Sequence, residues 1–76
     1  MLISGKLYKI KLPNKMFSMV KEEHVCAGAC IFIKMDLDEH KNYVNLTFLT
    51  KINTHTFSGT YNEKDSIQLQ FMELKL

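Results

Sequence analysis

Hydrophobic and polar residues alternate along several short segments of the chain, with the period of two that is typical of half-buried β-strands. The first such segment covers residues 6–12. Its inward face is predicted to hold Tyr8, Ile10 and Leu12, and its outward face Lys9 and Lys11. Pro13 and Asn14 end this strand, because proline cannot donate a ladder hydrogen bond and asparagine favours turns and helix caps.

The next segment, 15–25, has a different spacing. Its apolar residues, Met16, Phe17, Met19 and Val20, fit one face of a short helix that starts after Asn14. A long irregular loop fits the same residues. We therefore predict one short helix within residues 14–25, with the loop as the alternative.

Two further strands follow, joined by the polar turn 38–42. Segment 29–37 is the most apolar of the chain. Its alternation predicts that the side chain of Phe32 points outward. Four other side chains are predicted to point inward, namely Ile31, Ile33, Met35 and Leu37. Segment 43–50 is predicted to place Val44, Leu46 and Phe48 inward and Asn45 and Thr47 outward.

The last third of the chain predicts two more strands. After a turn at 51–53, segment 54–61 sets His55, Phe57, Gly59 and Tyr61 against a hydroxyl face of Thr54, Thr56, Ser58 and Thr60. Residues 62–65 form a turn, and 66–76 form a strand with Ile67, Leu69 and Phe71 on one side. The neighbouring apolar pair Phe71 and Met72 changes the phase, which predicts a bulge or a bend at a barrel corner.

Five short strands joined by tight turns predict a mainly β fold. Closure removes exposed strand edges, so we expect a small five-stranded antiparallel barrel or sheet of the SH3 or OB type. An α+β sheet with one packed helix is the alternative. The 76 residues are too few to enclose a second core, and we predict one domain over residues 1–76.

Composition narrows the possible partners. All ten basic side chains are lysine, and the net charge is only +2. Arginine is the residue that reads guanine and clamps phosphate, so sequence-specific DNA recognition is not expected. The first residues lack the pattern of a signal peptide, and no apolar run approaches a membrane span, which predicts a cytoplasmic protein without a membrane partner. A structural disulfide is not expected there.

The stretch His24–Phe32, HVCAGACIF, contains the only cysteines. Zinc prefers four nitrogen and sulfur ligands, and the candidate set is His24, Cys26, Cys30 and His40. The spacing fits poorly, since structural zinc sites usually pair their ligands as CxxC. We favour cysteines that pack as small hydrophobic residues, and we expect no cofactor.

A thiol enzyme would need Cys30 together with His24, His40 or His55. The chain has no nucleophile elbow, phosphate loop or HExxH motif, and it is short for enclosing a substrate pocket. We expect a protein that is not an enzyme.

Exposed apolar residues are the remaining signal. Tyr43 and Leu49 are out of phase with the inward residues of their strand, as Phe32 is in its own. Tyr43 and Leu49 are predicted to form an apolar strip for a partner, or to lie in a second core layer. Together with Phe32, Lys9 and Lys11 they are the candidate partner-binding residues.

These observations predict a small protein-binding or regulatory module, such as a phage-type accessory protein that modulates a host protein, or a homo-oligomeric unit. The expected partner is another protein or a second copy of the chain. The alternative is a non-specific nucleic-acid-binding protein. In that case phosphates would contact Lys6, Lys9, Lys11 and Lys51, and bases would stack on Tyr8, Tyr43 or Phe48. A zinc-bound protein or thiol enzyme is the third possibility.

Overall fold

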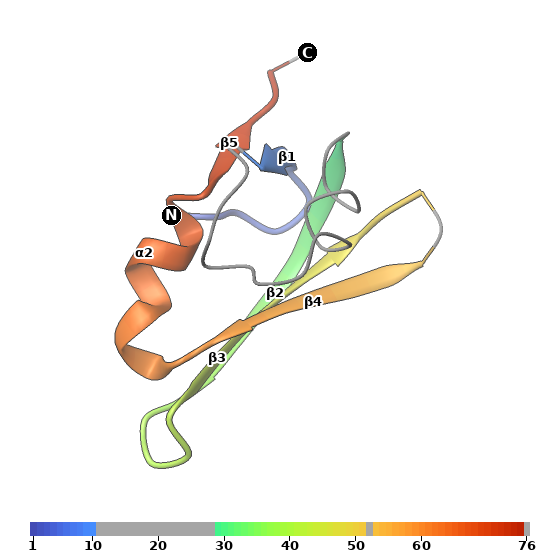
Figure 1. Cartoon of the computed structure of the whole chain (residues 1–76). Coiled ribbons are helices and arrows are strands. Elements are labelled where there is room, and N and C mark those ends of the chain that lie inside the picture. Colours follow the sequence, from blue (N-terminus) through green and yellow to red (C-terminus); the bar gives the residue numbers. More distant parts are fainter. Residues whose placement is uncertain (11–28, 52, 76) are drawn as a thin grey trace.

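The computed structural model describes residues 1–10, 29–51 and 53–75. In these residues the chain is mainly β, as predicted, with five strands and one short helical segment (Figure 1). The strands are β1 (Leu7–Ile10), β2 (Cys30–Asp38), β3 (Tyr43–Leu49), β4 (Thr54–Gly59) and β5 (Phe71–Glu73). The helical segment consists of a 3₁₀ turn, η1 (Tyr61–Glu63), followed directly by α2 (Lys64–Gln68). The helix predicted within residues 14–25 lies outside the described residues.

The five strands form one antiparallel sheet in the order β4-β3-β2-β1-β5. Strands β2, β3 and β4 are consecutive hairpins, and β1 joins β2 to β5. The sheet is open, and β4 and β5 are its two edges among the described strands. The prediction of a five-stranded antiparallel barrel or sheet is thus confirmed in its sheet form. No helix of the described residues is long and apolar enough to cross a membrane.

The helical segment replaces the first half of the strand predicted over 66–76, and that prediction is wrong. A helix turns the chain by about 100° per residue, so residues two apart point in nearly opposite directions. Ile67 is accordingly buried, whereas Leu69 is 66% exposed. Phe71 and Met72 both lie in β5 with ordinary alternation, Phe71 buried and Met72 39% exposed. The change of phase comes from the junction between helix and strand at residues 69–70 rather than from a bulge. The segment leads the chain from the β4 edge to the β5 edge (Figure 1).

A reciprocal pair of hydrogen bonds starts this helical segment. The backbone N–H of Glu63 donates to the carbonyl of Thr60 at 2.9 Å, and the N–H of Thr60 donates to Oε1 of Glu63 at 2.7 Å. The Thr60 hydroxyl lies 3.0 Å from the same carboxylate oxygen. A threonine followed three residues later by a glutamate is the sequence pattern of a capping box. That pattern was the available signal for a helix at this position.

We predict that this cap weakens in acid. The pKa of Glu63 lies below its ordinary value of 4.5, because its carboxylate accepts hydrogen bonds from the backbone and side chain of Thr60. A lowered folded pKa gives stability that is present above the ordinary pKa and is lost as the pH falls through the folded pKa. Glu63→Gln should therefore lower the melting temperature at pH 7, and the difference from wild type should shrink below about pH 4.

Thermal melts followed by circular dichroism between pH 3 and pH 7 measure this effect. Glu39→Gln is the control, because it removes a carboxylate in the β2–β3 turn without touching the cap. A difference between wild type and Glu63→Gln that stays constant over this pH range would contradict the assignment.

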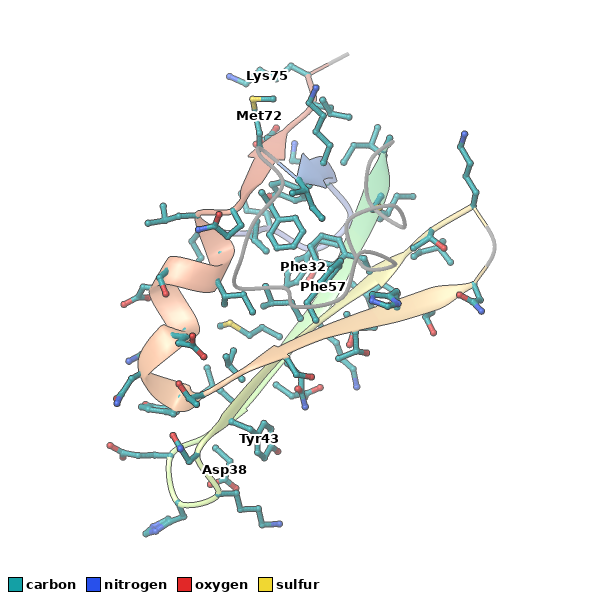
Figure 2. The ribbon with its side chains drawn as sticks, viewed as in Figure 1. Phe32, Asp38, Tyr43, Phe57, Met72 and Lys75 are labelled. Atoms are coloured by element: carbon teal, nitrogen blue, oxygen red, sulfur yellow. The ribbon has the colours of Figure 1, made fainter. Side chains whose placement is uncertain are left out.

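One face of the sheet, here called the inner face, carries the core. The core contains Tyr8, Cys30, Phe32, Val44, Leu46, Phe48, Phe57, Ile67 and Phe71. Phe48 lies at its centre, and its ring stacks on Phe71 at a centroid distance of 4.6 Å. The ring of Phe48 also meets Phe32 at 5.3 Å and Phe57 at 5.7 Å in edge-to-face geometry. Phe32 and Phe57 are labelled in Figure 2. Such pairs add to the hydrophobic contribution of the buried rings.

Strand β2 contains a β-bulge that changes its faces. Phe32 pairs with Phe48, but the next pair is Lys34 with Thr47, so Ile33 is an extra residue. Side chains of directly paired residues share a face, which places Phe32 inward with Phe48. The prediction that Phe32 points outward and that Ile31 and Ile33 point inward is therefore wrong. Beyond the bulge, the predicted inward direction of Met35 and Leu37 is confirmed by their pairing with Leu46 and Val44.

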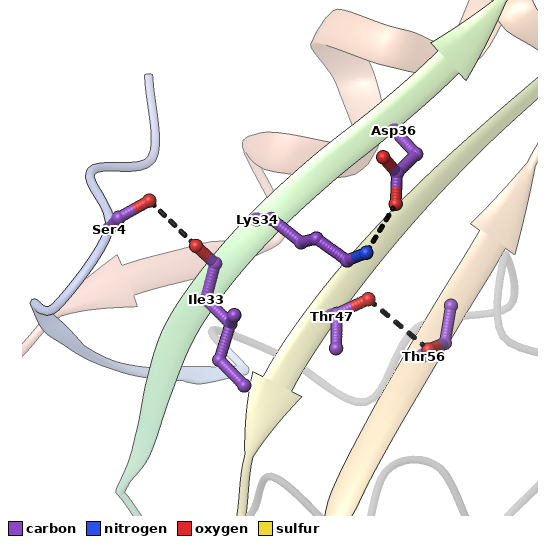
Figure 3. A network of polar contacts seen from close by, with 6 residues as sticks. All are labelled: Ser4, Ile33, Lys34, Asp36, Thr47 and Thr56. Atoms are coloured by element: carbon purple, nitrogen blue, oxygen red, sulfur yellow. Dashed lines mark hydrogen bonds and ion pairs between the residues drawn. The ribbon is translucent and has the colours of Figure 1, made fainter.

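The N-terminal segment binds the bulged part of β2. Gly5 has a φ of 85°, a left-handed value that favours glycine, and it lies in a turn closed by the Lys6 N–H and the Ile3 carbonyl at 3.2 Å. The turn brings the Gly5 N–H to the Phe32 carbonyl at 2.8 Å. The Ser4 hydroxyl donates to the Ile33 carbonyl at 2.7 Å (Figure 3). The bulge thus has its own hydrogen-bond partners.

Candidate protein-binding surface

The face of the sheet opposite the core, here called the outer face, carries a row of apolar side chains across three strands. Leu7 of β1 is paired with Ile31 of β2, and Ile31 is paired with Leu49 of β3. Leu49 is 44% exposed, and the bulge residue Ile33 beside this row is 37% exposed. We call Leu7, Ile31, Ile33 and Leu49 the outer-face patch. Its members are neighbours in space although they come from three strands.

Beside the patch, the outer face of β2, β3 and β4 carries polar side chains that contact one another. Lys34 and Asp36 form an ion pair at 3.3 Å on β2. The hydroxyls of Thr47 and Thr56 lie 3.3 Å apart across β3 and β4 (Figure 3). Farther along, the Ser58 hydroxyl donates to the Asn45 side chain at 2.7 Å. The apolar outer-face patch therefore borders a polar area, and Met72 of β5, paired with Lys9 and 39% exposed, is a further apolar residue of this face.

The two candidate contact residues of β3 both lie on the outer face, but they do not form one strip. Tyr43 begins β3 and Leu49 ends it, so their Cα atoms are about 20 Å apart at the rise of a β-strand. The polar residues Asn45 and Thr47 lie between them. Tyr43 is half-buried and pairs with Asp38 at the far end of the hairpin. Leu49 instead contributes to the outer-face patch.

The other candidate contact residues have different places. Phe32 is 4% exposed and belongs to the core, so it offers no surface to a partner. Lys9 lies in β1, half-buried and paired with Met72 of β5. Lys11 lies outside the described residues.

Of the four predicted zinc ligands, the structure describes Cys30 and His40, and these two do not lie together. Cys30 begins β2 and His40 lies in the turn after its end, so the nine-residue strand separates them by more than about 25 Å. Two ligands of one zinc ion must each lie within about 2.3 Å of it. His24 and Cys26 lie outside the described residues. Within the described part of the chain, no group of three or more metal-binding side chains is assembled.

Cys30 has the packing role that we favoured for it. Its side chain is 1% exposed and lies in the core. A thiol in this position is shielded from any substrate at the surface. His55 lies on the inner face, where its ring packs against Phe57 at a centroid distance of 4.8 Å.

The predicted stacking platform for nucleic acid is also largely buried. Tyr8 is 4% exposed and Phe48 is fully buried. The Tyr8 hydroxyl accepts a hydrogen bond from the Ile3 N–H at 2.8 Å. Bases stack on aromatic faces that are open to solvent, which leaves only the half-buried Tyr43 of the predicted set.

A shallow pocket of about 400 Å³ lies between the N-terminal residues, α2 and β5. It is lined by Met1, Leu2, Tyr8, Asp65, Gln68, Leu69, Phe71 and Glu73. Gln68 fixes one wall, since its Oε1 accepts from the Leu2 N–H at 3.2 Å and its Nε2 donates to the Lys64 carbonyl at 2.8 Å. This lining contains neither cysteine nor histidine, so it does not assemble the thiol site considered from the sequence.

Sequence reasoning found only Leu49 among the four residues of the outer-face patch. The bulge at Ile33 reverses the face of Ile31, and the register between β1 and β2 sets the place of Leu7. The case for a function rests on this geometry. No protein-family model, no curated protein and no solved structure matches the chain.

Proposed function

We propose that this protein is a small non-catalytic module that binds another protein through the outer-face patch. The observation that carries the proposal is the row of Leu7, Ile31 and Leu49, in which half-buried and exposed apolar side chains lie next to one another beside a polar part of the same sheet face. Exposed apolar clusters with a polar surround are typical of protein-binding surfaces. Binding a partner would remove this apolar surface from water.

The rigidity of the patch supports this function. Ile31 and Leu49 belong to hydrogen-bonded strands, and the bulge next to them is held by Ser4 and Gly5. A surface that is already ordered loses less conformational entropy on binding. On the sequence evidence we place this interaction in the cytoplasm, and a regulatory role toward a larger protein is the form of it that we favour.

We predict that substitutions in the outer-face patch abolish partner binding without unfolding the protein. The double variant Ile33→Ser and Leu49→Ser should lower the amount of protein partner captured from a lysate of the host by at least about tenfold, because central apolar contacts dominate interface energies. Leu69→Ser is the matched control, since Leu69 is exposed but lies outside the patch. Quantitative mass spectrometry of the captured proteins provides the measurement.

Two results would count against the proposal. If the double variant and wild type capture the same proteins in equal amounts, the outer-face patch is not the binding surface. If capture depends on nucleic acid, it should disappear after nuclease treatment and fall steeply with salt concentration, as phosphate contacts do. Circular dichroism of each variant establishes that the fold is retained.

A further inference from the structure

The edge strand β4 has a row of backbone groups that point away from the sheet. The Thr50 N–H donates to the Asn53 carbonyl at 2.8 Å, which closes the β3–β4 hairpin and sets the phase of the ladder. Hydrogen-bonded and non-hydrogen-bonded pairs alternate in an antiparallel ladder. His55, Phe57 and Gly59 therefore direct their backbone groups toward β3. The remaining strand residues, Thr54, Thr56 and Ser58, direct theirs outward.

Two hydrogen bonds beyond the strand agree with this phase. The Tyr61 N–H points toward the β3 side and donates to the Asn42 side chain at 3.2 Å. The Thr60 N–H points outward and donates to Glu63 at 2.7 Å. The Glu63 carboxylate thus binds the outward N–H of Thr60. The outward backbone groups of β4 that remain open to a partner strand therefore end at Ser58. Within the described part of the chain, the outward backbone groups of Thr54, Thr56 and Ser58 have no such partner.

Strand β4 lacks the features that usually protect an edge. Its sequence, THTFSG, contains no lysine, carboxylate or proline. Its register with β3 runs from Leu49 and Thr54 to Val44 and Gly59 without a bulge. Charges, prolines and bulges are the common means of preventing strand addition. The opposite edge, β5, is only three residues long and carries Glu73.

We infer that β4 pairs with β4 of a second copy, antiparallel, about a two-fold axis at Thr56. In this register Thr56 faces Thr56 of the second copy, and Thr54 faces its Ser58. These are the residues with outward backbone groups, so the pairing forms about six hydrogen bonds. Because of the two-fold axis, both copies use the same residues in the contact and no further copy can add to it. The two five-stranded sheets then form one continuous sheet.

The side chains and charges favour a second copy over a charged strand. Every outer-face side chain in the pairing is a hydroxyl that meets another hydroxyl, as Thr47 and Thr56 already do within the sheet. Because β4 contains no lysine, arginine, aspartate or glutamate, the net charge of +2 on each chain is not concentrated at the contact. An acidic or basic strand would have no counter-charge to meet. The pairing is also distinct from the outer-face patch, so it goes beyond the proposed function.

Pairing over five residues of each strand is a small interface, and we expect a weak dimer. Sedimentation velocity of the wild-type protein between about 10 µM and 1 mM should show a shift from monomer to dimer. Thr56→Lys should weaken the dimer at least about tenfold, because it places two like charges opposite each other at the axis. Thr47→Lys is the matched control, because Thr47 lies on the same face but in the interior strand β3, and this variant should dimerise like wild type.

The two-fold register has its own test. A mixture of the variants Thr56→Lys and Thr56→Glu should recover the dimer, because opposite charges then meet at the axis, whereas each variant alone remains monomeric. A wild-type protein that is monomeric at 1 mM overturns the inference, as does a mixture that fails to recover the dimer. A dimer lost in Leu49→Ser but kept in Thr56→Lys also overturns it, and assigns self-association to the outer-face patch.

Discussion

Replacement of Phe48 by alanine should remove a large part of the stability of this protein. The Phe48 ring is fully buried and packs against Phe71, Phe32, Phe57 and Tyr8. Truncation of a buried phenylalanine costs about 3–5 kcal/mol, since it removes apolar contacts and leaves a cavity. A domain of this length has a free energy of unfolding of about 4–11 kcal/mol. Urea titrations followed by circular dichroism give the change directly.

A neighbouring residue separates the effect of the core from that of the strand. Thr47→Ala changes the adjacent position of β3, on the outer face, and should alter the free energy of unfolding by about 0.5 kcal/mol or less. Phe48→Leu should lower the free energy of unfolding by an amount between those of Thr47→Ala and Phe48→Ala, because leucine retains part of the buried volume. A loss below about 1 kcal/mol for Phe48→Ala would contradict the position of this ring at the centre of the core.

Ile67→Ala should have the next largest effect, about 2–4 kcal/mol, because Ile67 is the apolar residue by which α2 enters the core. Leu69→Ala, two residues later, should cost about 0.5 kcal/mol or less because Leu69 is largely exposed. The same urea titrations measure both variants.

This pair also distinguishes the two interpretations of residues 66–70. In a strand, Ile67 and Leu69 would lie on the same face and their truncation would cost similar amounts. In a helix they lie on opposite sides, and only Ile67 contributes to the core. Equal losses would therefore contradict the helix.

The regular strands of this protein are predictable from alternation alone. In β3 and β4 every paired position keeps its register, and the predicted inward residues Leu46, Phe48 and Phe57 are all buried. The prediction fails in β2 because one extra residue shifts the period by one position. It fails at Ile67 and Leu69 because a short helix and a strand can share the same apolar spacing over three residues.

The outer-face patch is harder to predict from a sequence. Leu49 is recognisable as an outward apolar residue within its own strand. That Leu7 and Ile31 lie beside it depends on the pairing of β1 with β2 and of β2 with β3, which join residues far apart in the chain. Local periodicity indicates which face of its own strand a residue occupies, but it does not indicate which strands become neighbours in the sheet.

The extra residue in β2 also affects how this chain should be compared with others. Without Ile33, Phe32 and Lys34 would be adjacent and would keep their inward and outward directions, as would Met35 and Asp36. A chain shorter by this one residue can therefore keep the same core. Its alignment with this sequence would need a single-residue gap inside a strand, where alignments are usually made without gaps. Comparisons that treat β2 as two short blocks, before and after Ile33, should detect such relatives more readily.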